Sequence, residues 1–263
     1  MNPVNQTLFI PLYGKAWVSR RHILLNDPMA ERIWEAEAFP IRGKASSKWL
    51  AYNMAMRACV FDAWTQKQLE PGSNALVLHI GCGLDSRCMR VNRGAVRWID
   101  ADFEQVIEVR RRYFSESDGY AMRALNASCE RDLLALPEAD TAVVILEGVS
   151  MYLSAQALRR LMQILSDKYA QIHVLMDVYT QLAARLSRHR NPVNGLGVTT
   201  LYGVDDIQEL VRETRMRLVC EHAMTPKRLV DSLPGLERWG FKMLFPQNLY
   251  RKFYRLYELE GMP

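Results

Sequence analysis

The sequence predicts an α/β fold in which a mostly parallel sheet is covered by helices on both faces. From residue 75 onward, short apolar runs alternate with helix-compatible stretches, and several of those runs end in a glycine or an acid. Strands that alternate with helices form parallel sheets, because each connecting helix packs back onto the sheet. The chain of 263 residues is also long enough to bury a complete core.

Seven apolar segments are predicted to be strands from their length and their bounding turns. In chain order they are 75–80, 96–99, a weaker segment just before Asn126, 141–146, 172–176, 217–220 and 239–245. Helices are predicted between or after them, at 86–91, 103–114, 155–168 and beyond Val204. The chain therefore repeats the strand–helix–strand pattern along most of its length.

Residues 1–73 differ in composition and are predicted to be mostly helical. Ala, Leu, Met, Glu and Arg are frequent there, and aromatic residues recur at roughly helical spacing, which usually indicates a core. A turn signal, P-G-S-N at 71–74, separates this segment from the strand that follows. We expect one structural domain in two parts, a helical segment at 1–73 and a sheet-bearing core at 74–263.

Charge, cysteine content and hydropathy argue against several classes of protein. The net charge of +5 is mild, and the densest basic run, the three arginines at 110–112, lies near Glu108 and Glu116. We interpret it as a solvated helix face and expect no nucleic-acid partner. The five cysteines form no C-x-x-C pair and no zinc-type spacing, so reduced thiols and a cytoplasmic location are expected. Residues 1–9 lack a signal-peptide pattern, and no apolar run approaches the ~18 residues of a membrane span.

A glycine turn follows the first predicted strand, and ligands of open parallel sheets bind at such strand ends. Gly81 and Gly83, on either side of Cys82, would let the backbone turn sharply and approach a ligand closely. A short Gly-x-Gly is also common in ordinary tight turns. The turn is not a full G-x-G-x-x-G fingerprint, because Ser86 stands three positions after Gly83, and no G-K-[ST] follows. Dinucleotide and ATP binding are therefore disfavoured.

Acids end two further strands. Asp100 and Asp102 follow the glycine turn by about twenty residues, where a carboxylate can accept both hydroxyls of a ribose. The alternative for Asp102 is a cap for the helix that starts near Phe103. Adenosine binding without a pyrophosphate motif indicates S-adenosylmethionine. Glu147 ends a purely apolar strand, where an unpaired charge would be costly, so it needs a donor, a ligand cleft or solvent.

Several motifs, taken in order, carry a resemblance to a known family. They are V-L-H-I-G-C-G-L-D-S-R at 77–87, W-I-D-A-D-F at 98–103, L-E-G-V-S-M-Y-L at 146–153, M-R-A-C-V-F-D at 56–62, and the leading segments at 10–16 and 26–33. Together they resemble the leucine carboxyl methyltransferase family, which includes tetracenomycin-type O-methyltransferases of polyketide biosynthesis. The resemblance implies a Rossmann-like methyltransferase fold with a seven-stranded sheet and an N-terminal helical lid.

The resemblance also implies roles for single residues toward S-adenosylmethionine. Arg57, together with Lys15, would hold the methionine carboxylate, and an arginine fork suits that task. Asp102 would bind the ribose hydroxyls. Glu147 would lie beside the methionine amino end or the sulfonium, and Gly81 and Gly83 would allow the backbone to pass close to the cofactor.

The adenine contact departs from the family pattern. The family usually has an Asp followed by a small apolar residue after the third strand, whereas this chain has Asn126 followed by Ala127. An Asn carbonyl can still accept a hydrogen bond from the adenine amino group, although the charge is lost.

Methyl transfer from an activated sulfonium needs mainly alignment, so neither a catalytic triad nor a metal is expected. A neutral hydroxyl acceptor would need a general base, whereas a carboxylate would not. Tyr152 is the candidate on the acceptor side, because it follows Glu147 by little more than a turn, although a packing role is an equal alternative. His79, His173, His189 and His222 are the candidate bases, and each is also compatible with a structural role.

The leading hypothesis is O-methylation of a carboxylate or hydroxyl on a small-molecule acceptor in secondary metabolism. Methyl transfer to sulfur or nitrogen, and methyl esterification of a protein C-terminal carboxylate, remain alternatives because the cofactor half would look the same. A non-catalytic or nucleic-acid-binding Rossmann-type module is the alternative from a different class. It would not require Arg57, Asp102 and Glu147 together.

Overall fold

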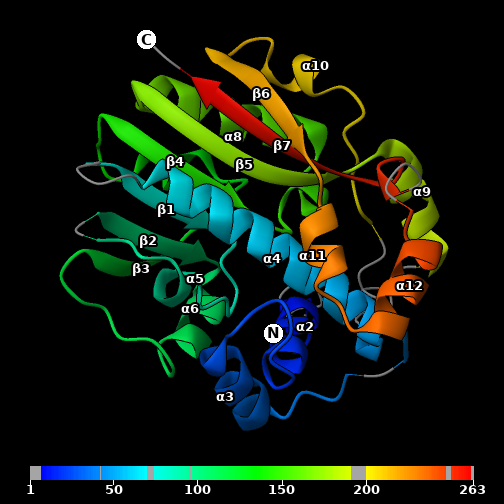
Figure 1. The fold of residues 1–263 in the computed structure, drawn as a ribbon. Coiled ribbons are helices and arrows are strands. Elements are labelled where there is room, and N and C mark those ends of the chain that lie inside the picture. Colours follow the sequence, from blue (N-terminus) through cyan, green and yellow to red (C-terminus); the bar gives the residue numbers. More distant parts are fainter. Residues whose placement is uncertain are drawn as a thin grey trace.

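A single seven-stranded sheet forms the centre of the molecule (Figure 1). The computed structural model describes residues 7–41, 43–69, 74–94, 96–190, 200–246 and 250–261. The strand order is β3-β2-β1-β4-β5-β7-β6, and β7 runs antiparallel to both of its neighbours. The strands are β1 (Leu76–Ile80), β2 (Arg97–Asp102), β3 (Tyr120–Ala124), β4 (Thr141–Leu146), β5 (Gln171–Tyr179), β6 (Met216–His222) and β7 (Tyr254–Gly261).

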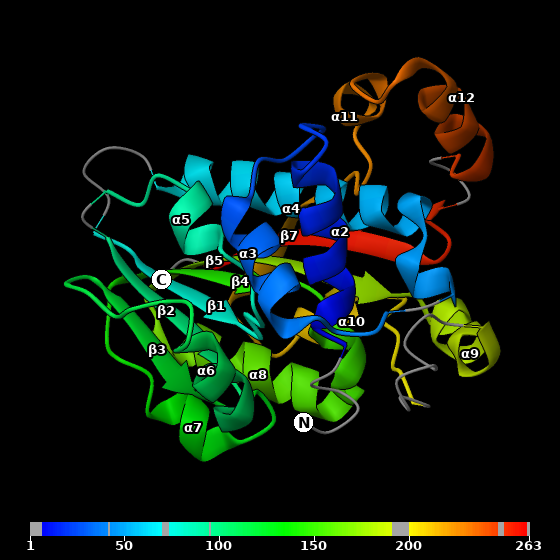
Figure 2. The ribbon, with the colours of Figure 1, turned by 90° about the horizontal axis from the view of Figure 1, so that it is seen from below.

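Helices cover both faces of the sheet (Figure 2). On one face lie α2 (Phe9–Ser19), α3 (Pro28–Glu37) and the long α4 (Lys48–Gln68); on the other lies α8 (Ala155–Lys168). The shorter described elements are η1 (Gly43–Ser46), α5 (Arg87–Arg90), α6 (Glu104–Arg110), α7 (Glu130–Leu134), η2 (Ser150–Tyr152), α9 (Gln181–Arg190), α10 (Ile207–Val211), α11 (Lys227–Asp231) and α12 (Gly235–Leu244).

Neighbouring residues of one strand serve two separate cores. Side chains alternate between the faces of a strand, so Val143 packs with Phe61 of α4, whereas Val144 packs with Leu161 of α8. Both faces of β4 are therefore apolar, which explains its continuous apolar run. The first cluster also contains Leu12 of α2, so the N-terminal helices and the sheet share one core.

The helix starts are explained by local chemistry. Asp27 accepts a hydrogen bond from the backbone N–H of Ala30, and Pro28 occupies the first turn of α3. Ser154 caps α8 in the same way, through the N–H of Ala157. Polar residues just before apolar periodic segments thus fix where these helices begin.

The sheet, its parallel character and its helical layers confirm the predicted fold class. Segments 75–80, 141–146, 172–176 and 217–220 all contain strands, and α8 spans the predicted 155–168. Most of the predicted turn at 71–74, and residues 1–6 of the N-terminus, lie outside the described residues. No helix in the described ranges is long and apolar enough to cross a membrane.

The predicted last strand at 239–245 is wrong, because this segment belongs to helix α12 and the last strand is β7. A short apolar run is ambiguous between strand and helix until its packing is known. Phe241 is buried against the rings of Trp49 and Tyr52 on α4, whereas Trp239 is 67% exposed. The helix starts after Pro234, and Phe245 and Pro246 follow its last residue.

The interpretation of residues 110–112 as a solvated face is wrong for Arg110. Its side chain is fully buried and pairs with Asp100, which is equally buried. Arg110 also donates hydrogen bonds to the carbonyls of Gly83 and Asp85, at 3.1 and 2.7 Å. It shares a face of α6 with Val106, four residues earlier, and that face packs inward. The arginine therefore links α6 to the end of β2 and to the glycine turn.

Replacing Arg110 tests this link. Arg110→Ala should lower the free energy of unfolding by about 3–5 kcal/mol, because it leaves a buried carboxylate without its partner. Arg111→Ala is the matched control. The Arg111–Glu104 pair is about half exposed on both sides, so a change within ~0.5 kcal/mol is expected. Urea unfolding measures both.

The pH dependence separates loss of this ion pair from loss of packing. Burial raises the pKa of Asp100, but Arg110 and hydrogen bonds from His79 and Trp98 outweigh it and hold the pKa below its usual range. Wild-type stability from this carboxylate is thus present above the ordinary Asp pKa and lost as pH falls. In Arg110→Ala, Asp100 can take up a proton, so the deficit should shrink toward acid pH. A deficit independent of pH would contradict the ion-pair explanation.

Candidate active site

One cavity of about 360 Å³ lies at the carboxyl ends of β1, β2 and β4, with residues of α2 and α4 on its wall. This is the edge at which ligands of open parallel sheets bind. All nine predicted site residues line it: Lys15, Arg57, Gly81, Gly83, Asp102, Asn126, Ala127, Glu147 and Tyr152. Residues distant in sequence are thus brought to one place.

The glycine turn needs its glycines. Gly81 and Gly83 have φ angles of +70° and +52°, in the left-handed region that disfavours side chains. A Cβ added to Gly81 would overlap Cγ2 of Val149, whereas one on Gly83 would meet only Cβ of Leu8, at 3.4 Å. At Gly81 and Gly83, therefore, no side chain of the glycine itself stands between the backbone of this turn and the cavity.

Asp102 fixes the turn from the end of β2. Its carboxylate accepts hydrogen bonds from the backbone N–H groups of Gly83 and Phe103, at 2.8 and 2.7 Å. Burial raises the pKa of Asp102, and these two hydrogen bonds oppose that rise. Both of these contacts are to backbone groups, one in the glycine turn and one at Phe103, the residue that precedes α6. The other candidate acid, Asp100, is fully buried and outside the cavity lining.

Arg57 reaches the cavity from α4 and is buried. Its Nε donates to Glu147 Oε1 at 3.0 Å, and its Nη1 donates to Asp177 Oδ2 at 2.9 Å and to the hydroxyl of Tyr254 at 2.8 Å. Burial would lower the pKa of Arg57, but Tyr254 and the two carboxyl groups hold it above its ordinary value. From the sequence, Arg57 could also have been a surface helix residue beside Asp62, but it is 5% exposed and Asp62 pairs with Arg87 and Arg90.

Glu147 lies between two arginines. Arg87 Nη2 is 2.5 Å from Glu147 Oε2, opposite the contact with Arg57. Burial raises the pKa of Glu147, but Arg87 and Arg57 outweigh it and hold the pKa below its usual range. The sequence predicts that Glu147, at the end of its apolar strand, needs a hydrogen-bond donor. The guanidinium groups of Arg57 and Arg87 are those donors.

Lys15 and Arg87 join the site to a wider ionic network. Lys15 Nζ lies 2.9 Å from Asp85 Oδ2, and Arg87 lies 3.4 Å from the same oxygen. Arg90 continues the chain of contacts to Asp85 and beyond, to Asp27 and Asp62. Lys15 therefore reaches the cavity as a member of an ion pair.

The remaining three predicted positions, Asn126, Ala127 and Tyr152, also line the cavity. Asn126 Oδ1 accepts a hydrogen bond from the N–H of Ser128 at 2.9 Å, so one of its two acceptor positions is used locally. Tyr152 lies on η2, and burial raises the pKa of its phenol to about 12, against a hydrogen bond with Thr7 that lowers it. Tyr152 is therefore a neutral phenol near pH 7.

Sequence reasoning missed the partners of the predicted residues. Asp177 and Tyr254 hold Arg57, and Asp85 and Arg87 hold Lys15 and Glu147. Asp177 ends an apolar run as Glu147 does, and this repeated pattern is the signal that could have identified it. Tyr254 had no such signal, because its strand was not recognised.

The comparisons with known proteins agree with this geometry. The profile of the leucine carboxyl methyltransferase family matches residues 10–166, more than half of the chain. The chain belongs to that family. The chain is 28% identical over 244 residues to the tetracenomycin polyketide synthesis O-methyltransferase TcmP of Streptomyces glaucescens, covering 90% of this chain and 88% of that one. It is 27% identical to the S-adenosyl-L-methionine-dependent methyltransferase dpfgK of Gibberella zeae, over 64% of this chain and 61% of that one.

Solved methyltransferase structures share the fold. Magnesium protoporphyrin IX methyltransferase from Synechocystis PCC 6803, with bound S-adenosylhomocysteine, gives a TM-score of 0.53 at 11% identity, over 89% of this chain and 93% of that one. An S-adenosylmethionine-dependent methyltransferase from Mesorhizobium loti gives 0.51 at 14% identity, over 76% and 97%. The protein is therefore an S-adenosylmethionine-dependent methyltransferase of this family, which confirms the predicted enzyme class and cofactor.

The cavity has the features that this cofactor requires. A bare glycine backbone, with positive φ at Gly81 and Gly83, leaves room for close approach. Asp102 presents a carboxylate among apolar neighbours such as Phe103 and Leu125. Glu147 forms part of the wall, and a carboxylate there suits a cationic sulfonium. When bound, the cofactor supplies an activated methyl group; the protein has to bind, orient and shield it.

Gly81→Ala tests the close backbone approach. The variant combines the cost of a left-handed Ala, about 1–2 kcal/mol, with the overlap against Val149. Gly94→Ala is the control, because Gly94 also has a positive φ but a Cβ there meets nothing within 4 Å. Gly81→Ala should lose more stability and bind S-adenosylmethionine more weakly, while Gly94→Ala keeps wild-type affinity. Equal effects in both variants, by calorimetry and urea unfolding, would show that the turn has no special role.

Proposed function

We propose that this methyltransferase methylates oxygen, in a carboxylate or an acidic hydroxyl of a small-molecule acceptor from secondary metabolism. The observation that carries the proposal is the chemistry of the cavity wall. One part of the lining consists of apolar side chains and tyrosines that belong to a single packed cluster: Ile10, Leu50, Met54, Met151, Tyr152, Tyr179 and Tyr254. Such a wall suits an apolar, compact acceptor body. The name of the Streptomyces relative, a polyketide O-methyltransferase, agrees with this class.

Three lining residues of a kind that can act as a general base, Tyr152, Glu147 and His79, are each poorly suited to deprotonate a neutral acceptor. Tyr152 is a neutral phenol whose pKa is raised to about 12. Glu147 is held ionised by two arginines, and its weakly basic carboxylate is occupied by them. His79 is 1% exposed and lies between Arg87 and Asp100. An acceptor oxygen that is already ionised needs no base, which favours a carboxylate.

We assign the cofactor-contacting roles as part of the same proposal. Asp102 binds the ribose hydroxyls, and Asn126 with Ala127 borders the adenine. Arg57 and Lys15 provide the positive charge for the methionine carboxylate, while Glu147 faces the amino end or the sulfonium. Tyr152 orients the acceptor by donating its phenol hydrogen. These assignments rest on the common lining of one cavity.

Acceptor chemistry can be tested with a labelled methyl group. Aromatic carboxylates and acidic phenols should accept the label at neutral pH, whereas ordinary phenols, with a pKa near about 10, should react only as pH rises. Base treatment then separates esters, which release labelled methanol, from ethers, which do not. Fast methylation of thiols, amines or unionised phenols at neutral pH would contradict the proposal. The outcome is independent of cofactor binding, which calorimetry measures separately.

Asp102→Asn tests the ribose assignment. The substitution keeps the shape of the side chain but removes its charge, so affinity for S-adenosylmethionine should fall by about 1–3 kcal/mol. Glu104→Gln, at an exposed position two residues later, is the control and should bind normally. If Asp102 only supports the turn, Asp102→Asn will lower the melting temperature and leave the calorimetric affinity unchanged.

The N-terminal segment is proposed to act as a lid. Leu8, Ile10 and Lys15 place α2 and its start on the cavity wall. A bound ligand stabilises the closed form by mass action, so S-adenosylhomocysteine should slow proteolysis before residue 71. ATP, which the sequence gives no site for, serves as the control ligand. Identical digestion patterns with and without S-adenosylhomocysteine, at saturating ligand, would leave the lid without support.

A further inference from the structure

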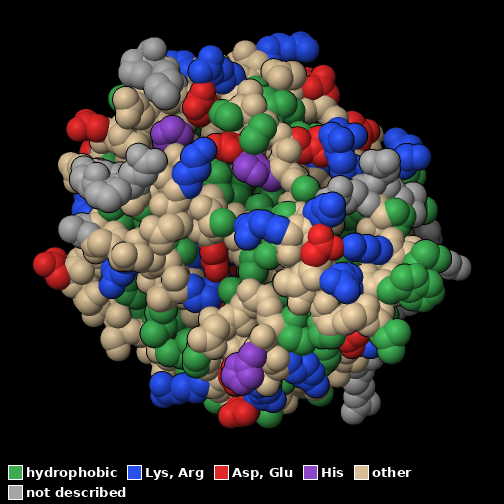
Figure 3. Space-filling view, in the orientation of Figure 1, with side chains coloured by type: hydrophobic (Ala, Val, Ile, Leu, Met, Phe, Trp, Pro, Cys, Tyr) green, Lys and Arg blue, Asp and Glu red, His purple; other side chains and the backbone are tan. Residues whose placement is uncertain are grey.

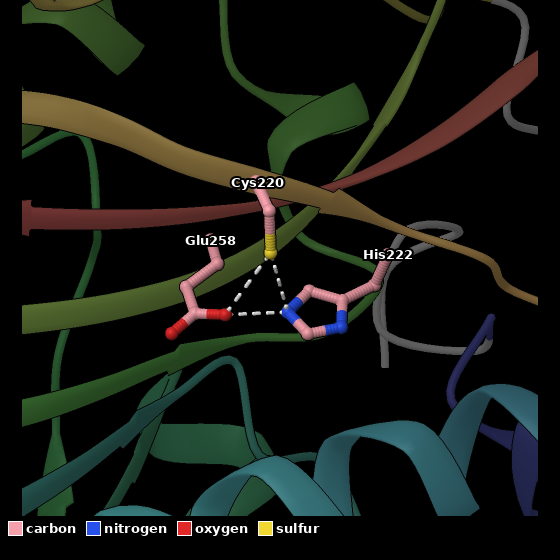
Figure 4. A group of neighbouring side chains, drawn as sticks. All are labelled: Cys220, His222 and Glu258. Carbon is pink, nitrogen blue, oxygen red and sulfur yellow. Dashed lines mark hydrogen bonds and ion pairs between the residues drawn. The ribbon is translucent and has the colours of Figure 1, made fainter.

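A second group of reactive side chains lies on strands β6 and β7, apart from the cavity. Cys220 and His222 come from β6 and Glu258 from β7, and their side chains point toward one another (Figure 4). None of the three lines the cavity. Cys220 is the exposed cysteine of the five, and the other two residues are partly buried.

The sheet itself creates this group. Cys220 is the register partner of Glu258, and His222 stands two residues further along, on the same face of β6. An irregularity in the pairing between Leu218 and Cys220 shifts the register just before the group. Such irregularities re-aim side chains. The backbone hydrogen bonds between the two paired strands therefore fix the relative positions of the three residues whose side chains could bind a metal ion.

Two of the three distances between the ligand atoms match the requirements of a small metal ion such as zinc. Cys220 Sγ lies 3.4 Å from both His222 Nε2 and Glu258 Oε2. Bond lengths of about 2.0–2.3 Å at tetrahedral angles place such ligand atoms roughly 3.4–3.6 Å apart. The Nε2–Oε2 distance is 2.5 Å, so this one pair has to separate by about 1 Å to admit an ion. Rotation of the His222 ring, whose side chain is 29% exposed, can supply that movement.

We propose that Cys220, His222 and Glu258 form a binding site for Zn²⁺ or a similar borderline-soft ion, with water as a fourth ligand. Sulfur, imidazole nitrogen and carboxylate oxygen together suit zinc, whereas magnesium and calcium prefer oxygen alone. Because the ligands come from the edge strand β6 and its neighbour β7, a bound ion would link these two strands and stabilise the edge of the sheet. The alternative is a His222–Glu258 ion pair beside an uninvolved thiol.

The sequence alone did not predict this site. Cys220 and His222 form only a C-x-H pair, and Glu258 follows His222 by 36 residues. The pairing of β6 with β7, which the sequence did not indicate, is what brings the third ligand to the other two.

The test is a cobalt titration of full-length protein that has been treated with a chelator and freed of any affinity tag. Wild-type protein should bind one Co²⁺ per chain, with the visible bands of tetrahedral cobalt and a thiolate-to-cobalt charge-transfer band in the near ultraviolet. Zn²⁺ should displace the cobalt. Cys220→Ser should abolish the charge-transfer band and weaken binding at least about 100-fold, more than the loss of an outer-sphere partner. Cys129→Ser, at a half-buried thiol elsewhere, should behave as wild type.

A second measurement guards against misfolding of the variant. Zn²⁺ should raise the melting temperature of wild type and of Cys129→Ser, but not of Cys220→Ser. His22→Asn removes an exposed imidazole in a left-handed turn, where Asn is tolerated, and should leave binding intact. The proposal is overturned if wild type shows no thiolate-to-cobalt band, or if the band persists in Cys220→Ser.

Discussion

The cavity depends on a buried ionic network that joins the N-terminal helices to the strand ends. Its cations and its carboxyl groups come from α2, α4, α5 and four segments around the sheet: Lys15, Arg57, Arg87 and Arg90 with Asp27, Asp62, Asp85, Glu147 and Asp177. Loss of one partner from such a network leaves a buried charge uncompensated, at a cost of about 3–5 kcal/mol. On the face of the molecule in Figure 3, basic side chains lie among acidic ones at the surface.

This network explains how helices before the sheet can take part in a site at strand ends. Arg57 on α4 and Lys15 on α2 are both buried, so each must find an acid, and Glu147 and Asp85 supply them. A second buried ion pair, Arg110 with Asp100, also contacts the glycine turn, because Arg110 donates a hydrogen bond to the carbonyl of Gly83. Side chains thus hold the turn in place in the absence of a ligand, and preorganisation of this kind lowers the cost of binding.

Most of the sheet and the acids at its strand ends were accessible from the sequence, because strand ends are marked locally, whereas Lys15 and Arg57 on the helices were indicated by the family resemblance. Glu147 follows its apolar run directly and Asp102 follows its run by three residues, and that pattern places both at the ligand-binding edge. The residues that pair with these site residues could not be predicted from the sequence. Whether Arg110 faces solvent or Asp100 depends on the packing of α6, and the position of Tyr254 depends on an antiparallel strand that the apolar run at 239–245 obscured. Tertiary contacts, and not local propensity, decide such positions.

The most direct test of the central claim is a crystal structure with S-adenosylhomocysteine bound. The ligand should occupy the cavity beside the glycine turn, with its ribose hydroxyls on Asp102 and its sulfur near Glu147 and Tyr152. The ionic contacts of Arg57 with Glu147 and Asp177 should define one end of the site. Density for the ligand elsewhere on the protein, or a ribose that makes no contact with Asp102, would contradict the account.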